Sequence, residues 1–135
     1  SSAGYGFQVA ESEVIASKRG GKQVLNVADD AEALVVTQAK GDTVATIGDN
    51  KKMLLFPLAD VPQMARGKGV VLQKFAQGGL KDACVFDKRT GLVCRDASGR
   101  ERTFDDLKDW MGKRAQAGRL PPKGFPRSGK FGHAL

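Results

Sequence analysis

Short basic stretches recur at three places in the chain, which we name the basic corners. Corner 1 reads KRGGK at residues 18–22, corner 2 reads RGKG at residues 66–69, and corner 3 reads RAQAG at residues 114–118. Glycine lets backbone amides approach a phosphate closely, and arginine and lysine supply the positive charge that attracts it. One such turn alone is weak evidence for an anion site, because solvated hairpins of a basic scaffold have the same composition. The evidence is stronger if the three corners occupy equivalent places in the fold.

The corners follow a repeat in the sequence. Arg19, Arg66 and Arg114 lie 47 and 48 positions apart. An offset of 48 also places VATIGDNKKMLLF, residues 44–56, over LVCRDASGRERTF, residues 92–104. Each stretch has an apolar start, a polar turn that contains glycine, and a final run that ends in phenylalanine. Repeats of this length are typical of propellers and similar arrays.

Short apolar or alternating runs, separated by turn-forming residues, predict the strands of each repeat. The runs lie at residues 22–27, 33–37, 43–47 and 53–56, and again at residues 70–75, 82–86, 92–95 and 102–104. Four short strands per repeat are typical of a propeller blade, whose apolar faces require neighbouring blades. We therefore predict an all-β, propeller-like array of about three four-stranded blades, in a truncated or open disc.

The segment FDDLKDWMGKRAQAG, residues 104–118, fits the repeat less well. It spaces Leu107 and Trp110 at a helical interval, which favours a helix. Its repeat counterpart, PLADVPQMARGKG, contains two prolines, which disfavour a long helix. We therefore predict a single helical turn near residues 105–110, followed by corner 3.

The last fifteen residues, PPKGFPRSGKFGHAL, contain three prolines and three glycines. This composition predicts that residues 121–135 form an extended basic tail beyond blades at residues 1–120. Phe125 and Phe131 are the side chains expected to anchor the tail on the blades.

The charge of the chain is unevenly distributed. The formal net charge is +7 and the isoelectric point is about 9.7. Residues 1–60 hold six basic and eight acidic residues, whereas residues 61–135 hold sixteen and seven. A basic surface favours an anionic partner such as nucleic acid, an acidic protein or an anionic membrane.

The chain carries none of the motifs that would indicate an enzyme. It has no phosphate-binding P-loop and no serine or cysteine nucleophile beside a base. Tyr5, the single tyrosine, lies among glycines and is not expected to act as a nucleophile. Asp105, Asp106 and Asp109 are interpreted as a solvated face rather than a cation site. We predict no catalytic residue, no metal and no cofactor.

Two cysteines, Cys84 and Cys94, are too few for a secreted disulfide scaffold, so we expect both to be buried free thiols. The single histidine, His133, lies in the tail, which disfavours a metal site. No run reaches the ~18 apolar residues of a membrane helix, and no signal peptide is visible.

Equivalent cations on successive blades would form a basic track along one rim. A track suits a long, bent polyanion better than a small ligand, and the corners lack aromatic platforms for stacked single strands. Duplex DNA contacted through its backbone is therefore the predicted ligand. The predicted DNA-binding residues are Lys18, Arg19, Lys22, Lys40, Lys51, Lys52, Arg66, Lys68, Lys74, Arg89, Arg100, Arg114 and Arg119.

The repeat, with RGGKQVL, then ARGKGVVLQ, then GRLPPKGFP, resembles the C-terminal domain of the A subunits of bacterial type IIA topoisomerases. Within that family the likeness is nearer to topoisomerase IV (ParC) than to its paralogue, DNA gyrase. The resemblance implies a β-pinwheel, a propeller-like disc whose blades exchange strands with their neighbours. It also implies that the outer basic rim binds duplex DNA, bends it and presents a segment to the catalytic core. The catalytic tyrosine of the family lies in other domains, so this chain alone is expected to be inert in cleavage.

Gyrase carries a seven-residue box, QRRGGKG, and the chain has SKRGGKQ at residues 17–23. Arg19, Gly20, Gly21 and Lys22 match the box, Lys18 is a conservative change, and the first and last positions depart. The degenerate box favours topoisomerase IV over gyrase and argues against tight, gyrase-like wrapping of DNA.

The resemblance implies partners besides DNA: the remainder of the same polypeptide, through it the B subunit, and a chromosome-organising protein. It implies a monomeric isolated domain and a cytoplasmic enzyme associated with the nucleoid, peripheral to the inner membrane face. Two alternatives remain open from the residues. The acidic first half beside the basic second half is compatible with a protein-docking module, and an RNA-binding β-module is a third possibility.

Overall fold

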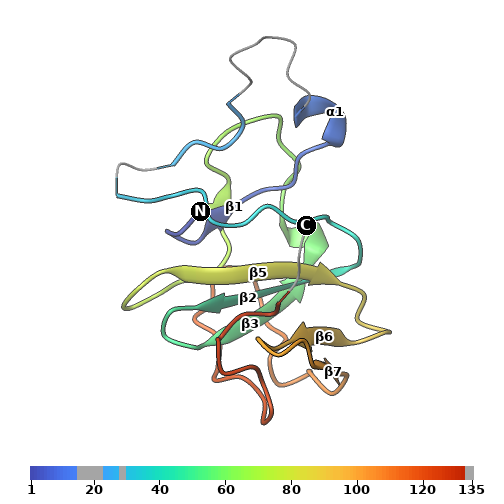
Figure 1. Cartoon of the computed structure of the whole chain (residues 1–135). Coiled ribbons are helices and arrows are strands. Elements are labelled where there is room, and N and C mark those ends of the chain that lie inside the picture. Colours follow the sequence, from blue (N-terminus) through green and yellow to red (C-terminus); the bar gives the residue numbers. More distant parts are fainter. Residues whose placement is uncertain (15–22, 28–29, 133–135) are drawn as a thin grey trace.

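A three-stranded antiparallel sheet lies at the centre of the computed structural model, which describes residues 1–14, 23–27 and 30–132. Its strand order is β3 (Met53–Pro57), β2 (Thr43–Gly48) and β5 (Leu80–Phe86), with β2 in the middle. Figure 1 shows this sheet as a layer, with β1 and the N-terminal segments on one side and β6, β7 and the tail on the other.

Both faces of the central sheet are buried, because side chains of a strand point alternately to its two faces. Ala45 and Ile47 of β2 belong to one core cluster, together with Phe131 of the tail. Val44 of β2 belongs to a second cluster, which also includes Leu72. A sheet that is apolar on both faces must be covered on both, which is what stacked blades provide.

The hairpin of β6 (Leu92–Arg95) and β7 (Glu101–Phe104) repeats the hairpin of β2 and β3. Val44 pairs with Phe56 in the first hairpin, and Leu92 pairs with Phe104 in the second. The two pairs are separated by the offset of 48 seen in the sequence, so the repeat sets the strand register.

Strands are exchanged between neighbouring units. β1 (Tyr5–Gly6) pairs with β4 (Val70–Val71), so that Tyr5 lies opposite Val71. An isolated bridge joins Met53 to Arg119 in the same antiparallel sense, one full repeat further along on both sides. Each corner segment therefore returns to cover the edge strand of the preceding unit, which protects an otherwise open edge.

Two short helical elements complete the fold. Helix α1 spans Glu11–Val14, and the 3-10 helix η1 spans Leu58–Asp60. Of the helices in the described part of the chain, none has the length and hydropathy needed to cross a membrane.

Most strands were predicted correctly, and two were not. The predictions at residues 43–47, 53–56, 82–86, 92–95 and 102–104 are confirmed, whereas the one at residues 70–75 shrinks to Val70–Val71. The prediction at residues 22–27 is wrong for its described part, where Leu25 makes only an isolated bridge to Gly67. The prediction at residues 33–37 is also wrong. The repeat makes residues 33–37 the counterpart of β5. β5 is a strand because it pairs with β2, whereas no described strand pairs with residues 33–37.

The segment after β7 forms turns rather than a long helix. The Trp110 amide donates to the Leu107 carbonyl at 3.0 Å, and the Met111 amide donates to the Lys108 carbonyl at 3.3 Å. These overlapping turns stand where we expected one helical turn.

The tail is anchored as expected by its two phenylalanines. Phe131 is fully buried, and Phe125 packs against the same core cluster. Their rings meet edge to face with centroids 5.7 Å apart. The division of the chain at residue 120 remains a prediction.

Candidate nucleic-acid interface

Backbone hydrogen bonds join each corner to the segment that follows the preceding corner. The Gly67 amide of corner 2 donates to the Val24 carbonyl at 2.9 Å, just after corner 1. The Ala115 amide of corner 3 donates to the Leu72 carbonyl at 2.8 Å, just after corner 2. Both members of the second pair lie one full repeat after those of the first, so the same backbone contact recurs at corners 2 and 3.

The corner glycines are explained by close packing of backbone. Gly69 has φ +83°, and a methyl group there would lie 2.2 Å from the Gly6 carbonyl oxygen. Gly118 has φ +84°, and a methyl group there would lie 2.5 Å from the Met53 carbonyl oxygen. A side chain would therefore clash with the edge strand of the preceding unit. Strand exchange accounts for these glycines without a phosphate, and the arginines and lysines carry the argument for an anion.

Corner 2 presents its charges to solvent. Arg66 and Lys68 are not buried by the strands around them, and both are exposed. The Lys68 ammonium lies 4.1 Å from the centroid of the Tyr5 ring, which gives it a cation–π contact. Tyr5 thus orients the lysine. These two cations are available to an anionic partner.

Corner 3 uses its arginine differently. Arg114 is only partly exposed, and its guanidinium donates a 2.6 Å hydrogen bond to the Val71 carbonyl. This bond braces corner 3 against β4. Ala115 adopts φ +72° where corner 2 has Gly67 at φ +140°, so the left-handed backbone is kept without glycine.

Three predicted residues of corner 1, Lys18, Arg19 and Lys22, lie outside the described residues. Their role remains a prediction. The contact from Gly67 to Val24 places the segment after corner 1 beside corner 2.

The other predicted cations fall into two groups. Lys51 and Lys52 form the turn between β2 and β3, and the Gln73 side-chain amide donates to the Lys52 carbonyl at 2.9 Å, which places Lys74 nearby. Arg119 joins them through its bridge to Met53.

Lys40 and Arg89 lie at the opposite end of β2. The Asp42 amide donates to the Phe86 carbonyl there, and Arg89 forms a 3.5 Å ion pair with Asp87. A six-residue strand is ~20 Å long, so Lys40 and Arg89 lie well apart from Lys51 and Lys52, and their role in DNA binding remains a prediction. Arg100 is exposed beside Gly99, in the turn between β6 and β7.

Sequence reasoning missed two cations near the first group. Lys81 is the second residue of β5 and lies beside the tail, and Arg127 lies in the tail close to Lys51. The basic composition of the tail was noticed, but its folding back on the turn between β2 and β3 was not foreseeable from the spacing.

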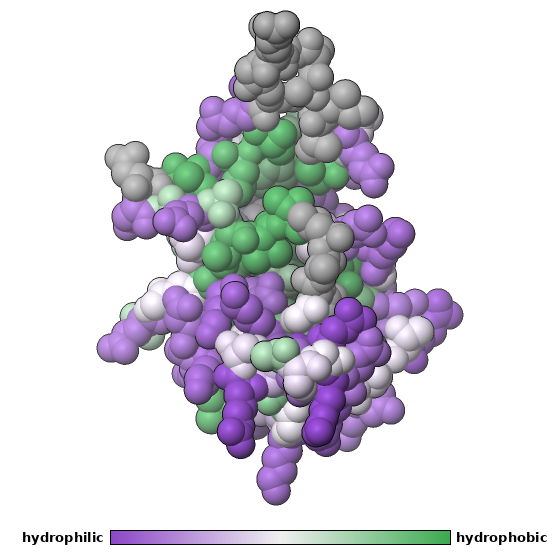
Figure 2. Space-filling model, viewed as in Figure 1, coloured by the Kyte–Doolittle hydropathy of each residue, from purple (hydrophilic) through white to green (hydrophobic). Residues whose placement is uncertain are grey.

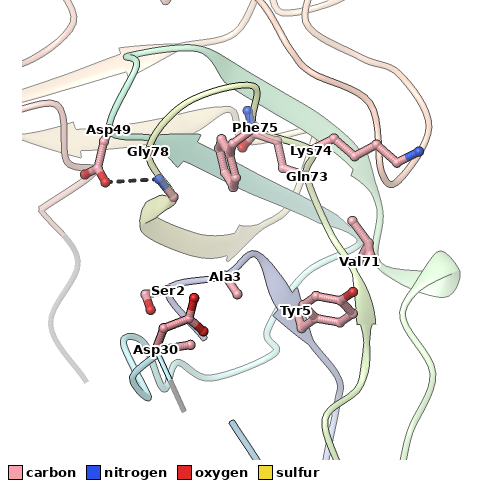
Figure 3. Close-up of a pocket in the computed structure, with 12 residues that line it drawn as sticks. Ser2, Ala3, Tyr5, Asp30, Asp49, Val71, Gln73, Lys74, Phe75 and Gly78 are labelled. Atoms are coloured by element: carbon pink, nitrogen blue, oxygen red, sulfur yellow. Dashed lines mark hydrogen bonds between the residues drawn. The ribbon is translucent and has the colours of Figure 1, made fainter. Parts of the chain in front are cut away.

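A cleft with a volume of about 680 Å³ lies between the N-terminal segment and β4. Figure 3 shows its lining, which combines Asp30, Asp49 and Lys74 with Phe75. The Asp49 carboxylate accepts a 3.2 Å hydrogen bond from the Gly79 amide and so fixes the turn. With two carboxylates and one lysine, this lining does not favour a phosphate.

Both cysteines are buried and free, as expected from the sequence. Desolvation raises the pKa of Cys94 to about 12 and that of Cys84 well above its usual range. Protonated thiols are poor nucleophiles and poor metal ligands. Among the residues that the structure describes, no three ionisable ligands gather into a metal cluster.

The exchanged strands and stacked corners agree with a comparison of the sequence with known families. A family model described as the DNA gyrase C-terminal domain, a β-propeller, matches residues 1–37 and 42–81, which is more than half of the chain. The chain belongs to this DNA gyrase C-terminal domain family. The propeller-like architecture predicted from the repeat and the β-pinwheel implied by the resemblance are thereby confirmed, with sheets that are not closed.

Individual members of the gyrase C-terminal domain family place the chain more closely. It is 47% identical to the A subunit of DNA topoisomerase 4 from Caulobacter vibrioides, over 97% of this chain and 17% of the relative. It is 38% identical to the same protein of Rickettsia bellii, over 97% of this chain and 18% of the relative. The chain thus spans less than a fifth of these curated relatives.

A solved structure supports the same family assignment. The structure of the E. coli ParC C-terminal domain superposes with a TM-score of 0.73 at 26% identity, covering 93% of this chain and 55% of that chain. The resemblance to the A subunit of topoisomerase IV inferred from the corners is therefore confirmed.

Proposed function

We propose that the chain is a DNA-binding and DNA-bending module of a type IIA topoisomerase, as part of the A subunit of topoisomerase IV. The observation that carries the proposal is the repeated backbone contact that stacks the corners. It supports cations at fixed intervals on successive blades, and Arg66 and Lys68 reach solvent there. A polyanion that follows such a row must curve with the disc.

The module itself performs no chemistry. Its role is to present a DNA segment to the catalytic core of the intact enzyme, for decatenation or for relaxation of supercoils. The relatives in which this domain occupies less than a fifth of the length support a catalytic centre in other domains. Its partners are then duplex DNA, the rest of the A subunit, and through it the B subunit. The intact enzyme would be cytoplasmic and associated with the nucleoid.

Binding should depend strongly on salt and weakly on base sequence. About six phosphate contacts give a slope of log K against log salt of roughly −5. A gel-shift series across salt, with ligation-circularisation of short linear duplexes, measures binding and bending together. Affinity that does not change with salt, or a bound DNA that circularises no faster than free DNA, would contradict the proposal.

A second candidate function is protein docking, and exposed apolar side chains favour it. Val27, Leu34 and Val36 are 40%, 40% and 71% exposed. Figure 2 shows apolar side chains gathered on the part of the molecule above the central sheet. A chromosome-organising protein or the enzyme's own core could cover them. A pull-down that survives high salt, without any DNA shift at low salt, would favour docking over DNA binding.

A further inference from the structure

A small pocket lies between the turn that joins β2 to β3 and the C-terminal tail. Its volume is about 210 Å³. Two of the residues that line it are cationic, Lys51 and Arg127, and none is acidic. The remaining lining residues are apolar or glycine, including Ile47 and Phe125. A cavity with two cations, apolar walls and no carboxylate favours an anion.

The tail wall of the pocket is held in place. Two hydrogen-bonded turns shape it, with the Phe125 amide donating to Pro122 at 3.2 Å and the Gly129 amide donating to Pro126 at 3.0 Å. The next buried residue, Phe131, donates through its amide to the Asp82 carboxylate at 2.9 Å. These bonds fix the segment that carries Arg127, so the pocket does not have to be assembled by its ligand.

The opposite wall carries an unusual lysine. Lys51 has φ +66°, a left-handed conformation that disfavours residues other than glycine. The repeat counterpart in the turn between β6 and β7 is Gly99, with φ +86°. The chain therefore has a lysine where the equivalent turn uses glycine, and that lysine lines the pocket. Backbone strain of this kind often marks a functional residue.

The other polar groups of this turn are used within the protein. The Asp49 carboxylate accepts from the Gly79 amide at 3.2 Å, and the Asn50 side chain accepts from the Lys52 amide at 3.0 Å. A third cation stands beside the pocket, because a methyl group on Gly129 would lie 3.4 Å from the Lys81 ammonium. Three cations thus stand at or beside the pocket, and the nearby carboxylates of Asp49 and Asp82 each accept a backbone hydrogen bond.

We propose that this pocket binds a phosphate group, and that in the DNA complex it holds one backbone phosphate between Lys51 and Arg127. The inference rests on the proposed function for its DNA ligand, and it makes the tail part of the DNA contact. A volume of about 210 Å³ is below the ~300–1,000 Å³ of small-molecule sites, which favours a single phosphate over a nucleotide.

The test compares three variants of the chain by fluorescence anisotropy with a labelled duplex across salt. Lys51→Gly and Arg127→Gln each remove one pocket charge, and Lys88→Gln removes one exposed charge at the opposite end of the central sheet. We expect each pocket variant to weaken binding about fivefold and to reduce the salt slope by about 1. The Lys88→Gln control should change affinity less than twofold. Pocket variants that bind like this control would overturn the inference.

A second measurement separates the pocket from the proposed function. Inorganic phosphate is titrated into the ¹⁵N-labelled chain, and amide shifts are followed at Lys51, Gly124 and Gly129. Saturable shifts at these amides that are lost in Arg127→Gln support phosphate binding by the pocket. If the wild-type chain shows these shifts but does not bind duplex DNA, only the proposed DNA function is contradicted. No shift at these amides, together with unchanged DNA binding by the variants, refutes the pocket and leaves the DNA function standing.

Discussion

The Ala115 amide donates a 2.8 Å hydrogen bond to the Leu72 carbonyl, and this bond reproduces the contact of Gly67 with Val24 one repeat earlier. Backbone contacts therefore position corners 2 and 3, and among their charged side chains Arg114 adds a hydrogen bond to the Val71 carbonyl. Charge can be removed from an exposed corner residue without moving the corner. The binding contribution of such a residue can thus be measured separately from its contribution to folding.

Corner 2 provides the first prediction. Replacing Arg66 and Lys68 together by glutamine should weaken duplex binding at least tenfold at low salt and reduce the salt slope by about 2, because two solvent-accessible cations are lost. The free energy of unfolding should fall by no more than about 1 kcal/mol, the size of the cation–π contact with Tyr5. Anisotropy and urea denaturation measure the two quantities.

The matched control is the double change of Lys88 and Arg89 to glutamine. These are also two neighbouring cations on the surface, but they lie at the turn between β5 and β6. If both double variants lose affinity equally, binding follows net charge and the corner has no special role.

Replacing the arginine of corner 3 should reduce stability more, and DNA affinity less, than the change in corner 2. The Arg114 guanidinium is bound to the Val71 carbonyl, so Arg114→Leu leaves a partly buried acceptor without its partner. We expect a loss of about 1–2 kcal/mol in the free energy of unfolding by urea. At temperatures where the variant is folded, its DNA affinity should fall less than that of the corner 2 variant. A variant of full stability with a large loss of affinity would instead make Arg114 a surface contact.

The repeat was sufficient to predict much of the fold. It placed the hairpins of β2–β3 and β6–β7 in the same register, because alternating side chains that face two cores leave little freedom. The repeat could not predict that residues 33–37 form no strand, because a strand forms only where a neighbouring strand supplies hydrogen bonds. Residues 33–37 and the confirmed strands are all short apolar or alternating runs. The presence of a partner strand decided which of them became strands.

The site was less predictable than the fold. Arg66 and Arg114 occupy equivalent positions in the repeat, yet one is exposed and the other is bound to Val71. The difference comes from a contact between residues distant in the sequence, which no local pattern reports. The glycines of the corners were interpreted as a means of approaching phosphate, and the structure uses Gly69 and Gly118 to approach backbone.

That use of glycine gives a third prediction. Gly118→Ala places a methyl group 2.5 Å from the Met53 carbonyl oxygen at φ +84°, so strain and a clash add together. We expect a loss of about 2–4 kcal/mol in the free energy of unfolding. Gly99→Ala is the control, because Gly99 has a similar φ of +86° with nothing within 4 Å. Gly99→Ala should lower the free energy of unfolding only by the backbone strain, about 1–2 kcal/mol. Equal losses in the two variants would show that the clash at Gly118 does not contribute.

Lys51 offers a prediction in which stability and binding change in opposite directions. Lys51→Gly relieves about 1–2 kcal/mol of left-handed strain and costs about 0.5–1 kcal/mol in chain entropy, so the chain should become about 0.5–1 kcal/mol more stable. Its DNA affinity should fall nevertheless. Ala115→Gly, at φ +72°, is the control that should gain similar stability and keep its affinity. A gain of affinity with the gain of stability at Lys51 would contradict this prediction.

The buried thiols predict how stability depends on pH. Their pKa values are raised in the folded chain, to about 12 for Cys94 and further for Cys84, chiefly by desolvation. An unfolded thiol loses its proton near pH 8.5, so above that pH the unfolded state binds fewer protons and the free energy of unfolding falls. The contribution of each thiol is complete below about pH 8 and is lost as the pH rises from about 9 to 12. Between about pH 8 and pH 10 we expect the contribution of each thiol to the free energy of unfolding to fall by about 1–2 kcal/mol, measured by urea denaturation. The double change of Cys84 and Cys94 to alanine, in which lysines still titrate, should flatten this fall, and an unchanged slope would show that the thiols do not cause it.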